Sequence, residues 1–134
     1  MDFTLELVVV PVSDVDRAKA FYSDRCGFGV DVDQSFGDDF RVVQLTPPGS
    51  ACSISVGTGL AKMAPGSLQG LQLCVTDIDA ARAELTDRGV EATPVRFIEN
   101  GEWKDGHGGP WNSFFFFSDP DGNGWAVQEK PSKP

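Results

Sequence analysis

An internal duplication constrains this chain more than any other feature of its sequence. The segment Val12–Ala20 matches the segment Val75–Ala83 residue by residue, at a constant offset of 63. One additional residue, Cys26, then precedes Gly27, whose counterpart in the second copy is Gly89. Self-similarity at a fixed offset indicates a repeated structural unit. We therefore expect the 134 residues to form two copies of one small module.

Each copy has the same order of local signals. Ser13 and Thr76 are each followed three residues later by an aspartate, which predicts a helix N-cap. Gly27 and Gly89 are suited to left-handed C-caps about three turns later. Apolar runs separated by turn residues predict one strand before each helix and three after it. The predicted strands cover residues 5–12, 29–33, 40–45 and 52–56, and then 71–75, 91–97, 113–117 and 124–129.

These signals predict an α+β fold made of two βαβββ modules. Module 1 covers residues 1–57, a linker rich in glycine and proline covers 58–69, and module 2 covers 70–134. The run Asp119–Gly124 consists of tight-turn residues and is expected to connect the last two strands.

The charge balance excludes several classes of partner. Eleven Lys and Arg residues against 20 Asp and Glu give a net charge of −9, which disfavours nucleic acid and membrane surfaces. The N-terminus lacks the pattern of a signal peptide, so we expect a cytoplasmic protein. The chain has three cysteines, Cys26, Cys52 and Cys74, which is an odd number, and their spacings are typical of neither disulfides nor a metal site. We therefore expect reduced thiols.

The duplicated segments and the closing run 119–125 carry a resemblance to a known family. The sequences Val12–Asp16, Ala20–Tyr22 and Val75–Asp79 together with this run are similar to those of the vicinal oxygen chelate superfamily. Its members include glyoxalase I, extradiol dioxygenases, methylmalonyl-CoA epimerase, fosfomycin-resistance enzymes and bleomycin-binding proteins. The resemblance implies half-open mixed β-sheets around a cavity, and a homodimer.

In the metal-dependent members of that family, four strand positions hold a divalent metal. The resemblance places them at Leu7, Ser55, Gly70 and Ala126. Such a site needs imidazole, thiolate or carboxylate ligands, so we predict no metal and no cofactor. As an alternative, a one-residue shift in strand register would turn Glu6 and Glu129 inward, where they and His107 could hold a divalent metal.

Without a metal, the cavity would bind a small molecule through its shape, its aromatic residues and a few hydrogen bonds. Because side chains alternate along a strand, Val9 and most of the candidates named below lie on the same strand face as the four metal-ligand positions. One alternate pair of the run Phe114–Phe117 is also expected to face the ligand, and the pattern leaves open which pair. The candidate ligand-binding residues are Leu7, Ser53, Ser55, Gln72, Cys74, Trp103, Trp111, Phe115, Ala126 and Gln128.

The segment 98–112 is rich in glycine and is expected to be a loop without structure of its own, acting as a lid. Trp103 and Trp111 in this segment could stack on a ligand. His107 is a candidate general base or acid, with Glu102 or Asp105 as a partner carboxylate.

The leading hypothesis is a metal-independent binding protein that sequesters an antibiotic or an aromatic or amphipathic metabolite. The alternative is an enzyme of the glyoxalase, dioxygenase or epimerase type, with an atypical metal site or acid-base chemistry by His107. A third hypothesis is an interaction module without a pocket. The acidic charge slightly favours a cationic ligand.

Overall fold

The computed structural model describes residues 1–132 and contains two compact units. Unit 1 consists of Met1–Leu68 and Asp119–Asn123, and unit 2 consists of Gln69–Ser118 and Gly124–Pro134. The turn between the last two strands thus belongs to unit 1, although its flanking strands belong to unit 2. The module boundaries at residues 57 and 70 stay a prediction.

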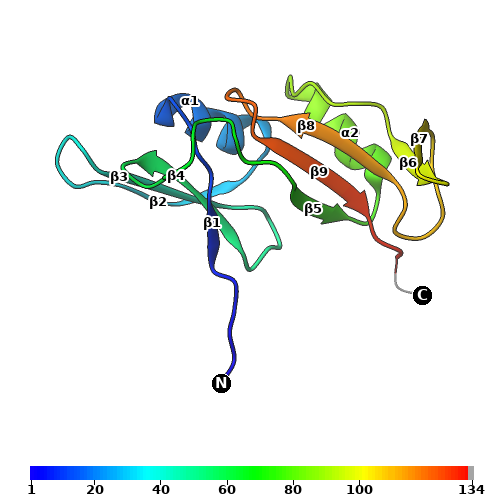
Figure 1. Cartoon of the computed structure of the whole chain (residues 1–134), viewed down its shortest axis with the longest axis horizontal. Coiled ribbons are helices and arrows are strands. Elements are labelled where there is room, and N and C mark those ends of the chain that lie inside the picture. Colours follow the sequence, from blue (N-terminus) through cyan, green and yellow to red (C-terminus); the bar gives the residue numbers. More distant parts are fainter. Residues whose placement is uncertain (133–134) are drawn as a thin grey trace. The chain divides into compact units, whose positions relative to one another are not determined.

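Unit 1 is a four-stranded sheet with one helical segment (Figure 1). The strand order is β1-β4-β3-β2, with β1 parallel to β4 and the other pairs antiparallel. The elements are β1 (Leu7–Val9), α1 (Val15–Ala20), the π-helix η1 (Phe21–Arg25), β2 (Gly29–Ser35), β3 (Arg41–Thr46) and β4 (Ser53–Thr58).

Unit 2 repeats this topology and adds one strand. Its order is β5-β9-β8-β6-β7, with β5 parallel to β9 and the other pairs antiparallel. The elements are β5 (Leu71–Val75), α2 (Ile78–Asp87), β6 (Arg96–Glu99), β7 (Glu102–Asp105), β8 (Phe114–Ser118) and β9 (Gly124–Glu129). The predicted α+β class is confirmed: each copy builds a mixed sheet in which its first and last strands pair in parallel. No helix of the described chain is long and apolar enough to span a membrane.

The helix N-caps lie one residue later than predicted. Asp14 and Asp77, rather than Ser13 and Thr76, have extended backbones and accept a hydrogen bond from the backbone N–H three residues on, both at 3.0 Å. Ser13 instead donates its hydroxyl to Asp121 at 2.6 Å. A distant partner therefore occupies the side chain that the local pattern assigned to the cap.

The extra residue in the first copy is accommodated by a π-helical turn. The N–H of Cys26 donates to the carbonyl of Phe21, five residues earlier, at 3.0 Å. The following Gly27 and its counterpart Gly89 both have positive φ, at 77° and 88°, as expected for helix ends. A π-helical turn accommodates one inserted residue while the helix continues. The helix of the first copy can therefore end at a glycine equivalent to the one that ends the helix of the second copy.

Each sheet buries the face that its helix covers. In unit 1, Arg41 and Asp33 on this face bind Asp16 and Lys19 of α1. In unit 2, α2 contacts β8 and β9, and its residue Ile78 is fully buried. The buried strand residues on these helix-covered faces are Val43, Leu45, Ile54, Val56, Phe115, Phe117, Trp125 and Val127. We call the opposite face of each sheet its open face.

The segment 98–112 is not a structureless loop. Its first part forms the β6–β7 hairpin, in which Ile98 pairs with Trp103. Asn100 and Gly101 at the turn have φ of 51° and 78°, the pattern of a tight type I′ hairpin turn. Asn-Gly is the strongest short-range hairpin signal in a sequence, so this hairpin was predictable. The predicted strand 91–97 is correspondingly shorter, with only an isolated bridge at Ala92 before β6.

Candidate functional site

The open face of unit 2 is defined by register across three strands. Gln72, Ala126 and Phe116 are direct neighbours across β5, β9 and β8, and Cys74, Gln128 and Phe114 form the next row. Directly paired residues project to the same face of a sheet. Four predicted ligand-binding residues therefore lie together on this face: Gln72, Cys74, Ala126 and Gln128.

Three aromatic rings form a corner on the same face. The ring of Trp103, on β7, meets Phe114 and Phe116 edge-on, with centroid distances of 5.4 and 5.5 Å. The two phenylalanine rings are parallel, 6.4 Å apart. The side chain of Trp103 is 48% exposed although it makes both contacts. Flat, rigid, partly exposed aromatic surface of this kind can stack on a planar apolar ligand.

Phe115, a predicted ligand-binding residue, lies on the wrong face. It is 0% exposed and belongs to the buried face beneath α2, together with Phe117. The pair on the open face is Phe114 and Phe116. The run of four phenylalanines is apolar on both faces of the strand, so its own pattern does not reveal which pair packs inside.

A chain of amide hydrogen bonds connects the open face of unit 2 to Trp111. Gln72 Nε2 donates to Gln128 Oε1 at 2.7 Å, and Gln128 Nε2 donates to the carbonyl of Trp111 at 2.8 Å. Trp111 has a φ of 65° and a side chain that is 53% exposed. Positive φ is strained for a residue with a bulky side chain. The amide chain therefore helps to hold Trp111 in an unfavourable conformation beside this face.

The open face of unit 1 is polar at its centre and apolar at its sides. Leu7 pairs with Ser53, and Val9 pairs with Ser55, between β1 and β4. On the other side of β4, Gln44 pairs with Ser55. Three predicted residues thus share this face: Leu7, Ser53 and Ser55. Alternation along β3 also places Gln44 and Thr46 on this face, and the pattern of the first and last strands alone does not reveal these two residues.

Ser55 contains a buried polar atom without a partner. Its side chain is 3% exposed, and Oγ makes no hydrogen bond within residues 1–132. Buried hydroxyl groups in folded proteins are normally satisfied. Ser55 is also one of the four positions at which the sequence resemblance placed metal ligands, and its unsatisfied atom is an observation independent of that resemblance.

The residues at these four positions do not fit a divalent metal. Leu7, Gly70 and Ala126 have no side-chain donor atom, which leaves only the hydroxyl of Ser55. Gly70 precedes β5 and has a φ of 91°, a conformation that disfavours a ligating side chain. No group of three or more His, Cys, Asp or Glu side chains that could hold a metal occurs in the described part of the chain.

The alternative metal ligands do not come together either. Glu129 accepts a hydrogen bond from the N–H of Ile78 at the start of α2, at 2.9 Å. His107 Nε2 lies 2.8 Å from Asp79 Oδ2. Glu6 is exposed in unit 1. The proposed site of Glu6, His107 and Glu129 is therefore not formed among the described residues.

His107 has a carboxylate partner, but a different one from those expected. Asp79, in the first turn of α2, binds its ring, whereas Asp105 lies 3.4 Å from Arg96. The side chains of His107 and Asp79 are 50% and 67% exposed. Because Asp79 belongs to the helix that covers the buried face, this contact ties His107 to the helix layer. The other predicted loop residue, Glu102, is exposed on β7.

The three cysteines form no disulfide among the described residues, and Cys74 is the exposed one of the three. It lies on the open face of unit 2, in the row of Gln128 and Phe114. Neither of these neighbours is a cation or a base that would favour a thiolate. We therefore assign Cys74 a contact surface and no nucleophilic chemistry.

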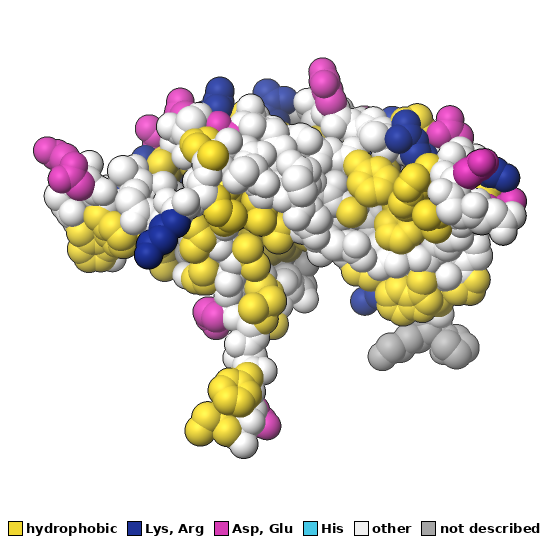
Figure 2. Space-filling model, viewed as in Figure 1, with side chains coloured by type: hydrophobic (Ala, Val, Ile, Leu, Met, Phe, Trp, Pro, Cys, Tyr) yellow, Lys and Arg dark blue, Asp and Glu magenta, His cyan; other side chains and the backbone are white. Residues whose placement is uncertain are grey.

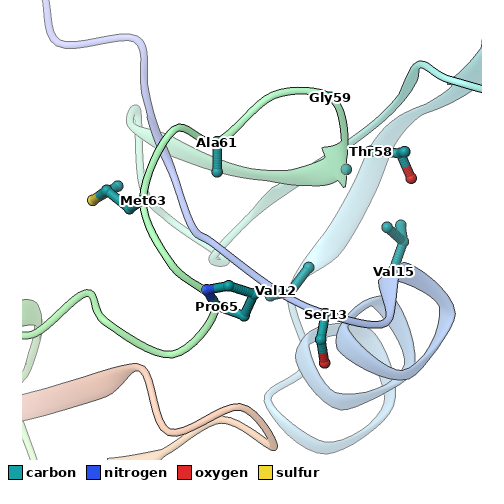
Figure 3. Close-up of a pocket in the computed structure, with 9 residues that line it drawn as sticks. Val12, Ser13, Val15, Thr58, Gly59, Ala61, Met63 and Pro65 are labelled. Atoms are coloured by element: carbon teal, nitrogen blue, oxygen red, sulfur yellow. The ribbon is translucent and has the colours of Figure 1, made fainter.

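A separate hollow of about 260 Å³ lies in unit 1 (Figure 3). The linker and the end of β4 form one part of its wall, and the segment leading into α1 forms another. None of the predicted ligand-binding residues contributes to it. The lining residues are Val12, Ser13, Val15, Gly57, Thr58, Gly59, Ala61, Met63 and Pro65.

The turn Asp119–Asn123 is structural, as predicted. Asp119 accepts hydrogen bonds from the buried hydroxyl of Tyr22 at 2.8 Å and from the side chain of Asn123. Burial raises the pKa of Asp121, but hydrogen bonds from Ser13 and the nearby charge of Arg17 outweigh it, so the pKa lies below its usual value. These contacts fasten the turn to the first copy.

Comparison with known proteins places this geometry in a family. TnmS3, an antibiotic binding protein from Streptomyces sp. CB03234, is 36% identical, with 98% of each chain covered and a TM-score of 0.77. A glyoxalase/bleomycin resistance protein from the same organism is also 36% identical, covering 93% of this chain and 99% of that one, with a TM-score of 0.73. A superfamily member from Sphaerobacter thermophilus DSM 20745 is 30% identical, covering 96% and 98%, with a TM-score of 0.76.

No curated protein matches the chain. The family model of the Glyoxalase/Bleomycin resistance protein/Dioxygenase superfamily matches residues 4–127. With two modules of the same topology and these relatives, the chain belongs to this superfamily, the vicinal oxygen chelate superfamily.

Proposed function

We propose that this protein binds a small aromatic or amphipathic molecule without a metal and sequesters it. The observation that carries the proposal is the aromatic corner on the open face of unit 2. Trp103 is almost half exposed there, between the rings of Phe114 and Phe116, where burial against a ligand would remove apolar surface from water. The antibiotic-binding relative supports sequestration of an antibiotic. The net charge of −9 favours a cationic ligand.

Binding can be tested with metal-free bleomycin and a panel of planar aromatic antibiotics, in the presence of a chelator. We expect a rise in melting temperature, since a ligand that binds only the native state stabilises it, followed by a stoichiometric isotherm in calorimetry. Trp103→Ala should weaken binding about tenfold or more. Phe36→Ala is the matched control, because Phe36 is an exposed aromatic that packs on Phe40 in the β2–β3 hairpin.

Two results would contradict this proposal. Elemental analysis that finds one tightly held divalent metal per chain would show that the site works through a metal. Equal affinities of the Trp103→Ala variant and the parent for every ligand found would show that the aromatic corner takes no part in binding.

A second candidate function is an enzyme that uses His107 for acid-base chemistry. The observation in its favour is the 2.8 Å contact with Asp79, because a carboxylate that orients an imidazole is a common arrangement in catalysis. Each compound that binds is incubated with the protein and examined for conversion by mass spectrometry. Loss of turnover in a folded His107→Ala variant would favour this function, and binding without conversion would favour sequestration.

We also propose that the protein forms a homodimer in the cytoplasm. The N-terminal segment before β1 alternates apolar and polar residues, and Phe3 and Leu5 are 91% and 71% exposed. Figure 2 shows this segment as a mostly apolar projection from unit 1. Contact with a second copy would cover it. That none of the three cysteines forms a disulfide among the described residues is consistent with a reducing compartment.

A further inference from the structure

The open face of unit 1 contains a hydrogen-bond chain with a fixed direction. Thr46 Oγ1 donates to the carboxylate of Asp31, and it lies 2.6 Å from Ser53 Oγ. A threonine hydroxyl has one proton, so Ser53 must be the donor in the second bond. Ser53 Oγ in turn accepts from Gln44 Nε2 at 3.3 Å. Every proton of the chain therefore points toward Asp31, which as a carboxylate can only accept.

This direction determines which atom Gln44 offers to a ligand. Its Nε2 is used by Ser53, and its Oε1 accepts no hydrogen bond from residues 1–132. Ser55, the direct neighbour of Gln44 on β4, has a buried Oγ that also lacks a partner. An unsatisfied hydroxyl donor and an unsatisfied amide acceptor thus stand next to each other.

The surroundings restrict the ligand further. Gln44 and Ser55 lie in one row across the sheet. Val9 pairs with Ser55 at one end of this row and Val32 pairs with Gln44 at the other, and both are apolar. Of the cations of the sheet and of α1, Arg41 and Lys19 are bound to Asp33 on the opposite face, and Arg17 is bound to Asp121. A carboxylate or phosphate would therefore meet acceptors without a compensating positive charge.

We propose that Ser55 and Gln44 recognise a neutral group in which a carbonyl oxygen lies beside an N–H or O–H, as in a lactam, a primary carboxamide or a hydroxyketone. The carbonyl oxygen accepts from Ser55 Oγ, and the neighbouring N–H or O–H donates to Gln44 Oε1. Asp31 is a positioning residue that fixes the chain and hence the orientation of the Gln44 amide. This inference rests on the proposed function, because it names the chemistry of the bound ligand.

The test uses the full chain and two small bicyclic probes, isoquinolin-1(2H)-one and its N-methyl derivative. The first has a carbonyl next to an N–H, whereas the second keeps the carbonyl and loses the donor. Affinities are measured by titration of amide chemical shifts in NMR spectra. We expect the lactam to bind about tenfold more tightly, and Gln44→Met to remove the difference.

Ser55→Ala separates recognition from a structural role. Because Oγ has no partner in the free protein, its removal should leave the melting temperature unchanged or raise it, yet weaken both probes about tenfold. Ser53→Ala is the matched control at the neighbouring serine: it breaks the chain and should lower the melting temperature. A lower melting temperature of Ser55→Ala with unchanged affinity would overturn the proposal.

Asp31→Asn tests the direction of the chain. An asparagine amide can donate to Thr46, so the chain can reverse and Gln44 can offer Nε2 instead. We expect the preference for the lactam to disappear in Asp31→Asn. The control is Asp39→Asn, which changes another exposed carboxylate of unit 1 and should keep the preference. Persistence of the full preference in Asp31→Asn would overturn the role of Asp31 in fixing the Gln44 amide.

Two outcomes of the probe titration distinguish the inference from the proposed function. Equal binding of the two probes by the parent protein overturns the donor–acceptor pair and leaves the binding function intact. If neither these probes nor the antibiotic panel binds, the proposed function fails, and the inference fails with it.

Discussion

Ser53 and Ser55 have the same side chain and the same burial, but opposite roles in the hydrogen-bond network. Ser53 both donates and accepts, whereas Ser55 Oγ does neither. An unsatisfied buried hydroxyl costs about 1–3 kcal/mol. Folding thus leaves one buried polar side-chain atom without a partner in the described chain, and that atom is the best guide to where a ligand would bind.

Asp121 should make the stability of the protein depend on pH. Its folded-state pKa lies below the usual value, so it stabilises the fold above the unfolded-state value of about 4 and loses this effect as the pH falls further. Asp121→Asn should lower the free energy of unfolding by about 1 kcal/mol at pH 7 and by less at pH 3. Urea unfolding at both values measures this. An equal loss at the two values would contradict it.

Trp111 should tolerate replacement by asparagine. Its φ of 65° is strained for tryptophan but acceptable for asparagine, and its side chain is half exposed. We expect Trp111→Asn to change the free energy of unfolding by less than about 1 kcal/mol, whereas Trp103→Asn, which loses two ring contacts, should cost more. Urea unfolding of the two variants gives the comparison. Equal losses would indicate that the backbone strain is negligible.

At the scale of elements, local patterns predicted the helices and most strands, because alternation and end signals are properties of neighbouring residues. The cap positions were wrong in both copies, because Ser13 and Asp14, like Thr76 and Asp77, are all good caps and residue type alone does not choose between neighbours. The hairpin β6–β7 was missed although Asn100 and Gly101 predict it. The glycine content of the segment 98–112 was taken as flexibility, whereas Gly101 provides a turn.

Gly101→Ala should weaken the β6–β7 hairpin. A Cβ at this position would touch nothing, so the cost is the backbone strain at a φ of 78°, about 1 kcal/mol. Gly109→Ala is the control, because it also has open space and its φ is not positive. Amide exchange should become faster in residues 96–105 of the first variant only. Unchanged exchange there would show that the turn does not need its glycine.

At the scale of the whole molecule, the duplication predicted the topology, since each copy had to form the same small sheet. It predicted the candidate site only in part. The strands that begin and end each module were followed correctly, so Ser55, Gln72 and Gln128 were assigned to the faces on which they lie, and their part in binding stays a prediction. The choice between Phe114 and Phe115 requires knowing which face the helix covers, and this is set by packing rather than by the strand's own sequence.

The proposed dimer should depend on the N-terminal segment. Replacing Phe3 and Leu5 by serine removes exposed apolar side chains that no residue of their own unit covers. Sedimentation should show a weaker dimer, with an unchanged circular dichroism spectrum. Met63→Ser, another exposed apolar residue of unit 1, is the control. If the double variant dimerises like the parent, the segment has another role.

The turn Asp119–Asn123 also affects the order in which the protein can mature on the ribosome. In the first copy, the hydroxyl of Tyr22 donates to Asp119, and the carbonyl of Pro11 accepts from the side chain of Asn123 in addition to the N–H of Gly66. The first copy is synthesised long before these residues leave the exit tunnel, and until then it lacks the hydrogen bonds that this turn supplies. The two halves of the duplicated gene therefore no longer encode separable proteins: an expressed fragment ending at residue 68 would lack the segment that completes it.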